Sequence, residues 1–152
     1  MAPLIVLLIA TALARLAGGF GVRPLRSWPS AARVGLAVMF CFTAAAHFNS
    51  VRPDLIRMVP PGVPYPEFMV TFTGICEVLG AIGLLVPATR RIAAIALIVM
   101  LMAVLPANIH AARADLTIGG SQATPLIPRV ALQVVLIALL WWCAVRRTRS
   151  AG

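Results

Sequence analysis

Five long runs of apolar residues, separated by short segments rich in Pro, Gly and Arg, account for most of the chain. The runs cover about residues 3–18, 32–48, 68–86, 92–112 and 129–146. Each run is close to the ~20 residues that cross a bilayer as a helix. Hydrocarbon offers no hydrogen-bond partner to an open strand, and five runs cannot close a barrel, so the runs must be α-helices. The pattern predicts an all-α fold, a polytopic membrane helical bundle that forms one integral membrane domain over residues 1–152.

The first run is short and could be mistaken for a secretory signal. No basic residue precedes its apolar core, and Arg15 follows that core instead. A cleaved signal peptide has the opposite polarity. We therefore expect residues 3–18 to be retained as a membrane helix.

Composition supports the membrane class and excludes a soluble domain. Hydrophobic residues make up 61% of the 152 and charged residues only 11%, and the mean hydropathy is +0.98. A soluble domain of this size does not contain so high a fraction of apolar residues. The net charge is +9, but no soluble fold is available to carry a basic stripe, so the expected partner is the lipid bilayer and not nucleic acid.

The distribution of the basic residues, all thirteen of which are Arg, predicts an orientation. If the five helices alternate, one side of the membrane receives Arg15, Arg23, Arg26, Arg33, Arg90, Arg91, Arg146, Arg147 and Arg149. The other side receives only Arg52, Arg57, Arg113 and Arg129, together with Asp54, Glu67 and Asp115. Because basic loops stay in the cytoplasm, we expect a multi-pass protein of the bacterial inner (plasma) membrane, with its N-terminus outside and its C-terminus cytoplasmic.

The three cysteines, Cys41, Cys76 and Cys143, all lie within predicted helices. None belongs to a CxxC motif or an outer loop, so neither a thioredoxin-type site nor a loop disulfide is expected. Cys41 and Cys76 fall at similar depth, which makes a bridge conceivable. We favour the alternative, in which each buried Cys acts as a small hydrophobe.

The outer connection between the second and third runs is rich in proline. Val59–Pro66 cannot be helical, because proline removes donors and biases the preceding residue toward extended conformations. Pro53–Met58 is expected to form a short turn at the interface. The whole connection is either a stiff linker or a lid over the outer mouth of the bundle, with Tyr65 at the head-group level, and the sequence leaves both open.

Two further features concern the fourth run. The short turn at residues 87–91 ends the third helix at a proline and makes the third and fourth helices antiparallel neighbours. Pro106 lies inside the fourth run and predicts a kink there. Beyond it, residues 114–128, which include Gln122, are expected to form an outer loop.

Glu77 is the only acidic residue inside any of the apolar runs. A carboxylate there is unfavourable by several kcal/mol unless it is protonated, paired or hydrated, so it indicates a functional site. The alternative is a protonated Glu that hydrogen-bonds a neighbouring helix for packing. Thr73 and Glu77 share one helical face, and Gly74 and Gly83 add small residues nearby, so Glu77 is expected to face protein and not lipid.

Other polar side chains fall at successive depths from the outer surface when each helix is given a rise of 1.5 Å per residue. In order of increasing depth they are His110, then Asn108 and Gln133, then His47, with Glu77 near the midplane. The inner half of the bundle holds almost nothing comparable. The sequence therefore predicts a polar pocket open to one side.

In that pocket His47 and Glu77 are the candidate catalytic acid/base pair. Thr73, Asn108, His110 and Gln133 are the candidate substrate-binding residues. A histidine taken alone is more often structural than catalytic. Two His and one Glu could bind a metal, but no ligand pair is spaced i,i+3 or i,i+4 on one helix, so we expect no metal.

The order of the motifs resembles the DoxX-like family of small bacterial integral membrane proteins. The pieces that carry the resemblance are Ala46–Phe48, Met58–Pro60 with Pro64, Thr73–Gly80, Leu85–Pro87 with Arg90 and Arg91, Pro106–Ile109, and Arg129 with Gln133. It implies a four-helix core made by the second to fifth helices, with the first as an addition. Some members of that family are linked to quinone-coupled sulfur oxidation or to thiol and oxidative-stress complexes. The chain has no outer-facing dithiol, which argues against thiol exchange.

Three functions are compatible with these observations. In the first, the protein is a redox-associated subunit whose pocket takes a quinone head group; His47 and Glu77 carry protons, while Asn108 and Gln133 orient the ring. A quinone is then the candidate cofactor and small lipophilic ligand, and a redox subunit or a second copy of the chain is the candidate partner. In the second, it is a cofactor-independent isomerase, cyclase or hydrolase on a lipophilic substrate. In the third, it is a non-catalytic scaffold or transport accessory. The sequence leaves open whether the protein is an enzyme.

Overall fold

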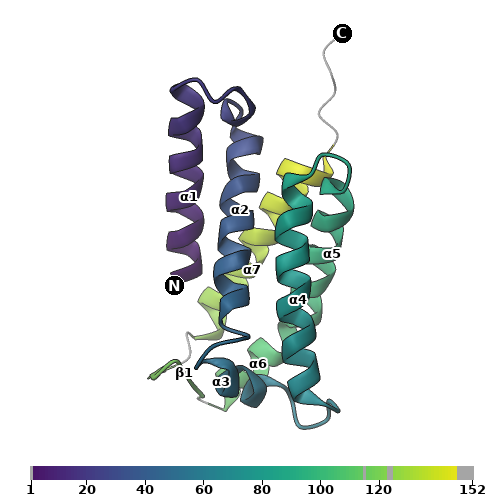
Figure 1. Cartoon of the computed structure of the whole chain (residues 1–152). Helices are drawn as coiled ribbons and strands as arrows, with labels where there is room; N and C mark the ends of the chain where they lie inside the picture. The colour runs from purple at the N-terminus through teal and green to yellow at the C-terminus, as the bar shows by residue number, and fades with distance from the viewer. Residues whose placement is uncertain (1, 115, 123–124, 147–152) are drawn as a thin grey trace.

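The fold is a bundle of long helices with one short hairpin at one end (Figure 1). The computed structural model describes residues 2–114, 116–122 and 125–146, with the backbone alone at residues 121 and 122. Asp115, Arg147 and Arg149 therefore lie outside the described residues. The elements are α1 (Ala2–Gly19), η1 (Arg23–Leu25), α2 (Trp28–Ala45), α3 (Arg52–Met58), α4 (Pro66–Leu85), α5 (Arg90–Ala103), α6 (Leu105–Arg113), β1 (Thr117–Ile118), β2 (Ser121–Gln122), α7 (Leu126–Leu140) and η2 (Trp141–Val145), a π-helical turn.

Five helical segments of the described chain are long and apolar enough to cross a membrane. They are α1, α2, α4, α5 continued by α6, and α7 continued by η2. Each coincides with one of the five predicted runs, so the prediction of an all-α, multi-pass membrane protein is confirmed. Large apolar side chains such as Leu8, Leu79 and Val99 are exposed on the outside of the bundle, where lipid solvates them.

The predicted bounds of the second helix were wrong at both ends. α2 begins at Trp28 and not at residue 32, because the Ser27 side chain accepts a hydrogen bond from the Ser30 N–H (3.3 Å) and caps the first turn. It ends at Ala45 and not at residue 48. The N–H groups of Ala46 and His47 turn back to carbonyls three residues earlier, which tightens and ends the helix. His47 therefore lies in the turn after α2.

The fourth span is broken, as Pro106 predicts. α5 ends at Ala103, and α6 begins at Leu105 with Pro106 in its first turn. Proline has no N–H to donate to the preceding turn, and its ring crowds the carbonyl there. The break separates α6, which carries Asn108 and His110, from the straight part of the span.

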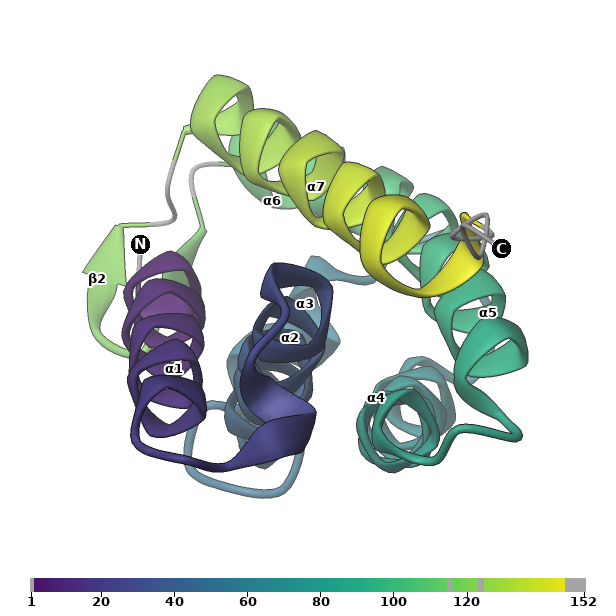
Figure 2. The ribbon, with the colours of Figure 1, turned by 90° about the horizontal axis from the view of Figure 1, so that it is seen from above.

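Helices α2, α4, α5 and α7 surround a common core, and α1 lies on the outside of α2 (Figures 1 and 2). The core includes Leu36, Phe40, Leu84, Leu97, Leu136 and Leu140. α1 buries only Leu7, Ala14 and Gly18, a spacing of seven and four residues that makes one narrow seam along the helix. α1 is thus joined to the bundle mainly through α2.

The loops lie alternately at the two ends of the bundle, as expected for helices that alternate in direction (Figure 1). One end, called here the Arg-rich end, carries the α1–α2 loop, the α4–α5 loop and the end of η2. The other end carries α3, α6 and the hairpin, and is called here the α3 end. The predicted antiparallel contact of α4 with α5 is confirmed: a Cβ added at Gly80 would lie 2.5 Å from Leu97 Cδ2, so these helices approach closely.

The α3 end is more ordered than the sequence analysis anticipated. β1 and β2 pair antiparallel, with Ile118 opposite Ser121, and Gly119 and Gly120 both have positive φ (58° and 77°). A two-residue turn of this kind favours glycine at both positions. Gly-Gly was therefore the signal that distinguished this segment from a plain loop. The Gly119 N–H donates to Asp54 Oδ2 of α3 (2.7 Å), so the hairpin is attached to α3.

Candidate functional site

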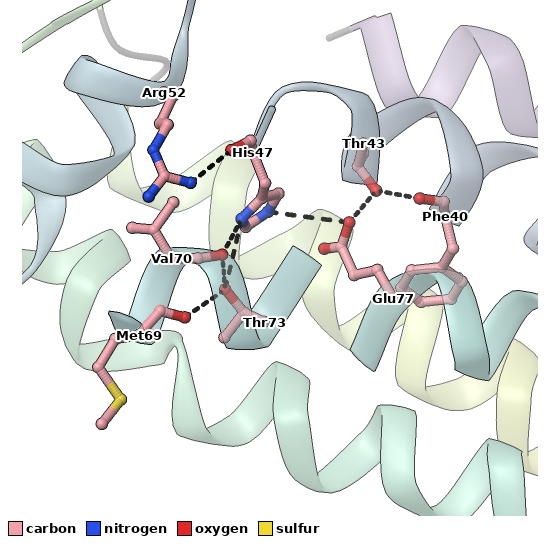
Figure 3. Close-up of polar contacts among 8 residues, drawn as sticks. All are labelled: Phe40, Thr43, His47, Arg52, Met69, Val70, Thr73 and Glu77. Carbon is pink, nitrogen blue, oxygen red and sulfur yellow. Dashed lines mark hydrogen bonds and ion pairs between the residues drawn. The ribbon is translucent and has the colours of Figure 1, made fainter. Parts of the chain in front are cut away.

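The Glu77 carboxyl points toward α2 and not toward lipid, as predicted (Figure 3). The Thr43 hydroxyl donates to Glu77 Oε2 (2.8 Å), and the same hydroxyl oxygen lies 3.1 Å from the Phe40 carbonyl. The Glu77 side chain is 13% exposed. The acid is therefore held between two helices, by a hydrogen bond that crosses from α2 to α4.

His47 lies between α2 and α4 with its two ring nitrogens in different environments (Figure 3). Its Nδ1 is 2.7 Å from the Val70 carbonyl, and its Nε2 is 3.9 Å from Glu77 Oε2. A carbonyl oxygen can only accept, so Nδ1 carries a hydrogen. In the neutral ring Nε2 is then unprotonated and presents its lone pair toward Glu77.

The gap between His47 and Glu77 matters for what the pair can do. At 3.9 Å the two atoms are too far apart for a direct hydrogen bond. The pair can hold one proton in either of two ways, as a carboxylic acid beside a neutral ring or as a carboxylate beside an imidazolium. An oxygen atom placed between Nε2 and Oε2 could hydrogen-bond both groups.

Residues of α4 fix the ring of His47 against that helix. Thr73 Oγ1 lies within hydrogen-bond distance of the carbonyls of Met69 (2.9 Å) and Val70 (3.0 Å), between which its single hydrogen is shared, and 3.4 Å from His47 Nδ1. A Cβ added at Gly74 would lie 2.6 Å from His47 Cβ. The small residue at position 74 thus allows the turn after α2 to contact the α4 backbone.

Two residues that contact this pair were not among the predicted site residues. Thr43 precedes His47 by four residues, and that i,i+4 spacing on the α2 sequence could have identified it. Arg52 of α3 donates to the His47 carbonyl (3.0 Å) and to the Glu67 carbonyl (3.4 Å). A regular helical spacing could not have identified Arg52, because Arg52 reaches the His47 carbonyl only through the turn that connects α2 to α3.

The predicted amide residues form a second group, where α5, α6 and α7 meet. Gln133, 8% exposed, donates through Nε2 to the Leu101 carbonyl (2.8 Å) and accepts from Asn108 Nδ2 at 3.5 Å. Arg129 donates to Asn108 Oδ1 (3.3 Å). This group connects α7 to both sides of the break near Val104.

The structure therefore places the predicted site residues in two groups. Thr73, His47 and Glu77 are in one, and Asn108 and Gln133 in the other. Within the described chain, no hydrogen bond or ion pair joins one group to the other, and none involves the His110 side chain. That all of them line one pocket stays a prediction.

In residues 2–114, 116–122 and 125–146 no group of three or more His, Cys, Asp or Glu side chains is placed to hold a metal ion. Cys41, Cys76 and Cys143 are free thiols. The chemistry available at the first group is thus that of one imidazole, one carboxyl and two hydroxyls.

Comparison with known families identifies the larger part of the chain. Residues 36–144 match the model of a family described as a domain of unknown function, DUF8561. The chain belongs to the DUF8561 family. The match begins inside α2, so α1 precedes it, and both groups of polar residues lie within the DUF8561 region. No curated protein and no solved structure matches the chain.

Proposed function

We propose that this DUF8561 protein is a redox-associated, quinone-linked subunit of DoxX-like type in the bacterial inner membrane. In this proposal the N-terminus is outside and the C-terminus is cytoplasmic, so the α3 end faces the periplasm. The observation that carries the proposal is the His47–Glu77 pair, in which the Val70 carbonyl fixes the ring tautomer and Nε2 stands 3.9 Å from Glu77 Oε2.

The geometry suits proton exchange with a carbonyl oxygen. Reduction of a quinone to a quinol needs two electrons and two protons. In either arrangement of its proton, the pair offers one donor, the carboxylic acid or the imidazolium, to a quinone oxygen placed between the two groups. Each side chain is 13% exposed, so neither is completely enclosed by protein. A redox partner subunit must supply the two electrons, and the second proton must reach the other quinone oxygen from water at the membrane surface.

The resemblance to the DoxX-like family supports the same assignment. The motifs that carry it run from Ala46 to Gln133 and include the predicted residues His47, Thr73, Glu77, Asn108 and Gln133. In the proposal the amides of Asn108 and Gln133, with His110 and Thr73, orient the head group. α2, α4, the α5–α6 span and α7 correspond to the four-helix core, and α1 is the addition.

The test is the pH dependence of quinone binding by the purified protein. A short-chain quinone is titrated into wild type and into Glu77→Gln, which keeps an oxygen for the Thr43 hydrogen bond but cannot ionise. We expect the wild-type affinity to change at least about tenfold across the pH range in which the pair titrates, and this change to be smaller in Glu77→Gln, where only the His47 imidazole can still take up a proton. Glu67→Gln makes the same chemical change at the exposed end of α4 and should follow wild type. Absence of quinone binding to wild type, or an unchanged pH profile in Glu77→Gln, rejects the proposal.

A second candidate is a non-catalytic scaffold, and one observation favours it. Thr43 bonded to Glu77 joins α2 to α4, and Gln133 bonded to Leu101 joins α7 to α5. Such bonds stabilise membrane bundles without any ligand. On this reading Glu77→Leu lowers the thermal stability in detergent, Glu77→Gln does not, and no lipophilic carbonyl compound is found by mass spectrometry of the purified protein. If a carbonyl compound other than a quinone is found, a cofactor-independent acid/base enzyme becomes the better assignment.

A further inference from the structure

Two arginines from different helices come together at the Arg-rich end. Arg33 of α2 donates from Nη1 to the Cys143 carbonyl (2.7 Å) and from Nη2 to Ser30 Oγ (2.7 Å). Arg90 is the first residue of α5, and α2 and α5 both contact η2, the element that carries Cys143. Arg33 and Arg90 are close enough for their charges to repel.

In the part of the chain that the structure describes, no carboxylate side chain lies near enough to balance these charges. The four acidic residues of the whole chain are Asp54, Glu67, Glu77 and Asp115. Asp54 and Glu67 lie at the opposite end, Glu77 is bonded to Thr43 in the middle of the bundle, and Asp115 follows α6 in the sequence. Like charges held together and partly removed from water repel strongly, so this arrangement favours a bound anion.

Arg90 also has unused hydrogen-bonding capacity. Its Nε is buried and has no partner in the described part of the chain. A buried donor left unsatisfied is unfavourable. Arg33, in contrast, is already held in place by its two hydrogen bonds, so an anion would meet one fixed guanidinium and one with a free donor.

The surroundings resemble the boundary between hydrocarbon and head groups. Trp28, Trp141 and Trp142 are exposed near this end of the bundle, as is typical of residues at the membrane interface. Apolar side chains are exposed beside Arg90 as well, at Leu85 and Ile92. A ligand at this place can therefore combine an anionic head with an acyl chain along α4 and α5.

From this juxtaposition we propose that Arg33 and Arg90 bind the phosphate group of an anionic phospholipid between α2, α5 and η2. Phosphate oxygens accept two hydrogen bonds at once from a planar guanidinium, which makes Arg the usual partner for this group. The lipid would satisfy Arg90 Nε, neutralise the repulsion and fasten the end of η2 to α2 and α5. A soluble phosphate has the same chemistry but gains nothing from the apolar side chains.

The experiment measures lipid binding to the full chain in detergent by native mass spectrometry. The probes are phosphatidylglycerol, phosphatidylcholine and inorganic phosphate. We expect phosphatidylglycerol to bind at least tenfold more tightly than phosphatidylcholine, and inorganic phosphate not to compete at equal concentration. Arg90→Gln should lower the affinity for phosphatidylglycerol at least tenfold. Arg23→Gln removes one charge from an exposed position at the same end and should change it less than twofold.

Several outcomes would overturn the proposal. An equal loss in Arg90→Gln and Arg23→Gln would mean that only the general charge of this end attracts lipid. Equal binding of the two lipids would exclude a site for an anionic head group, and competition by inorganic phosphate would assign the site to a soluble anion. If Arg90→Gln does not fold, Arg90→Lys is the alternative variant, because it keeps the charge but loses the planar guanidinium that donates two hydrogen bonds at once. The affinity of Arg90→Lys for phosphatidylglycerol should still fall several-fold. Wild-type affinity in a folded Arg90→Lys would refute the proposed pair of hydrogen bonds from the planar guanidinium to the phosphate.

Discussion

At Gly74 the missing side chain decides how the turn after α2 meets α4. His47 rests directly on the α4 backbone there, with its Nδ1 bonded to the Val70 carbonyl. A Cβ at this position would lie 2.6 Å from His47 Cβ and 2.9 Å from His47 Cγ, so the imidazole would have to shift. The geometry of the acid/base pair is therefore set in part by a residue that has no chemistry of its own.

A Gly74→Ala substitution tests this role. The added Cβ would lie 2.6 Å from His47 Cβ and 3.0 Å from Phe48 Cε2, and we expect overpacking to destabilise the protein by about 1–3 kcal/mol. The measurement is thermal unfolding in detergent. Gly19→Ala is the control, because a Cβ at the last residue of α1 meets nothing within 4 Å. If both variants unfold at the wild-type temperature, the close contact at Gly74 is not required.

At the scale of elements, α3 and the hairpin form one unit although 65 residues separate Asp54 from Gly119. One Asp54 oxygen accepts from the Gly119 N–H and the other from Arg57. These two donors lower the pKa of Asp54 below its ordinary value of 3.8, with the Gly119 N–H as the larger cause. The charged form of Asp54 is thus the form that holds the hairpin.

This hairpin attachment should depend on acid in a defined direction. Because the folded-state pKa is lowered, the stabilisation is fully present above pH 3.8 and is lost as the pH falls through the folded-state value. Asp54→Asn should release the hairpin already at neutral pH, seen as faster hydrogen exchange of the Gly119 N–H. Wild type should approach the variant only at strongly acidic pH, after correction for intrinsic exchange rates. Equal protection of Gly119 in wild type and Asp54→Asn at neutral pH would contradict this account.

The elements also show how far the sequence could lead. Hydrocarbon requires every long apolar run to be a helix, so the five spans and the break at Pro106 could be predicted. The end of α2 could not, because Ala44–Phe48 reads as a continuation of the helix, while the tightened turn at Ala46 depends on tertiary contacts.

The candidate site was predictable to the same partial extent. The rise per residue along a helix predicts how deep in the membrane a side chain lies, but not the direction in which it points around the helix axis. His47, Thr73 and Glu77 came together as expected, whereas Gln133 donates to the Leu101 carbonyl near the helix break and Asn108 donates to Gln133.

At the scale of the whole molecule, the alternation of the loops ties the proposed function to one orientation. The end of α2, which His47 follows, lies at the α3 end (Figure 1), and Glu77 lies near the middle of α4. If basic loops stay in the cytoplasm, a ligand would approach the His47–Glu77 pair from the periplasmic side.

Orientation can be measured with cysteines introduced at the two ends. Gly62 lies in the loop before α4, and Ala88 lies in the loop between α4 and α5; both are exposed. A membrane-impermeant maleimide added to intact spheroplasts should label Gly62→Cys and should reach Ala88→Cys only after lysis. The native cysteines all lie within spans, and the wild-type chain gives their background. The reverse pattern would place the α3 end in the cytoplasm.

The single seam between α1 and α2 has a consequence for how such a chain can diversify. α1 packs mainly on α2, where Thr11 lies against Gly35, and on η1, where Gly18 lies against the Leu25 backbone. The DUF8561 match begins beyond it, at residue 36. A segment exchanged for the N-terminal span would therefore have to keep small or closely fitting side chains along the same line to preserve the contact with the inherited bundle.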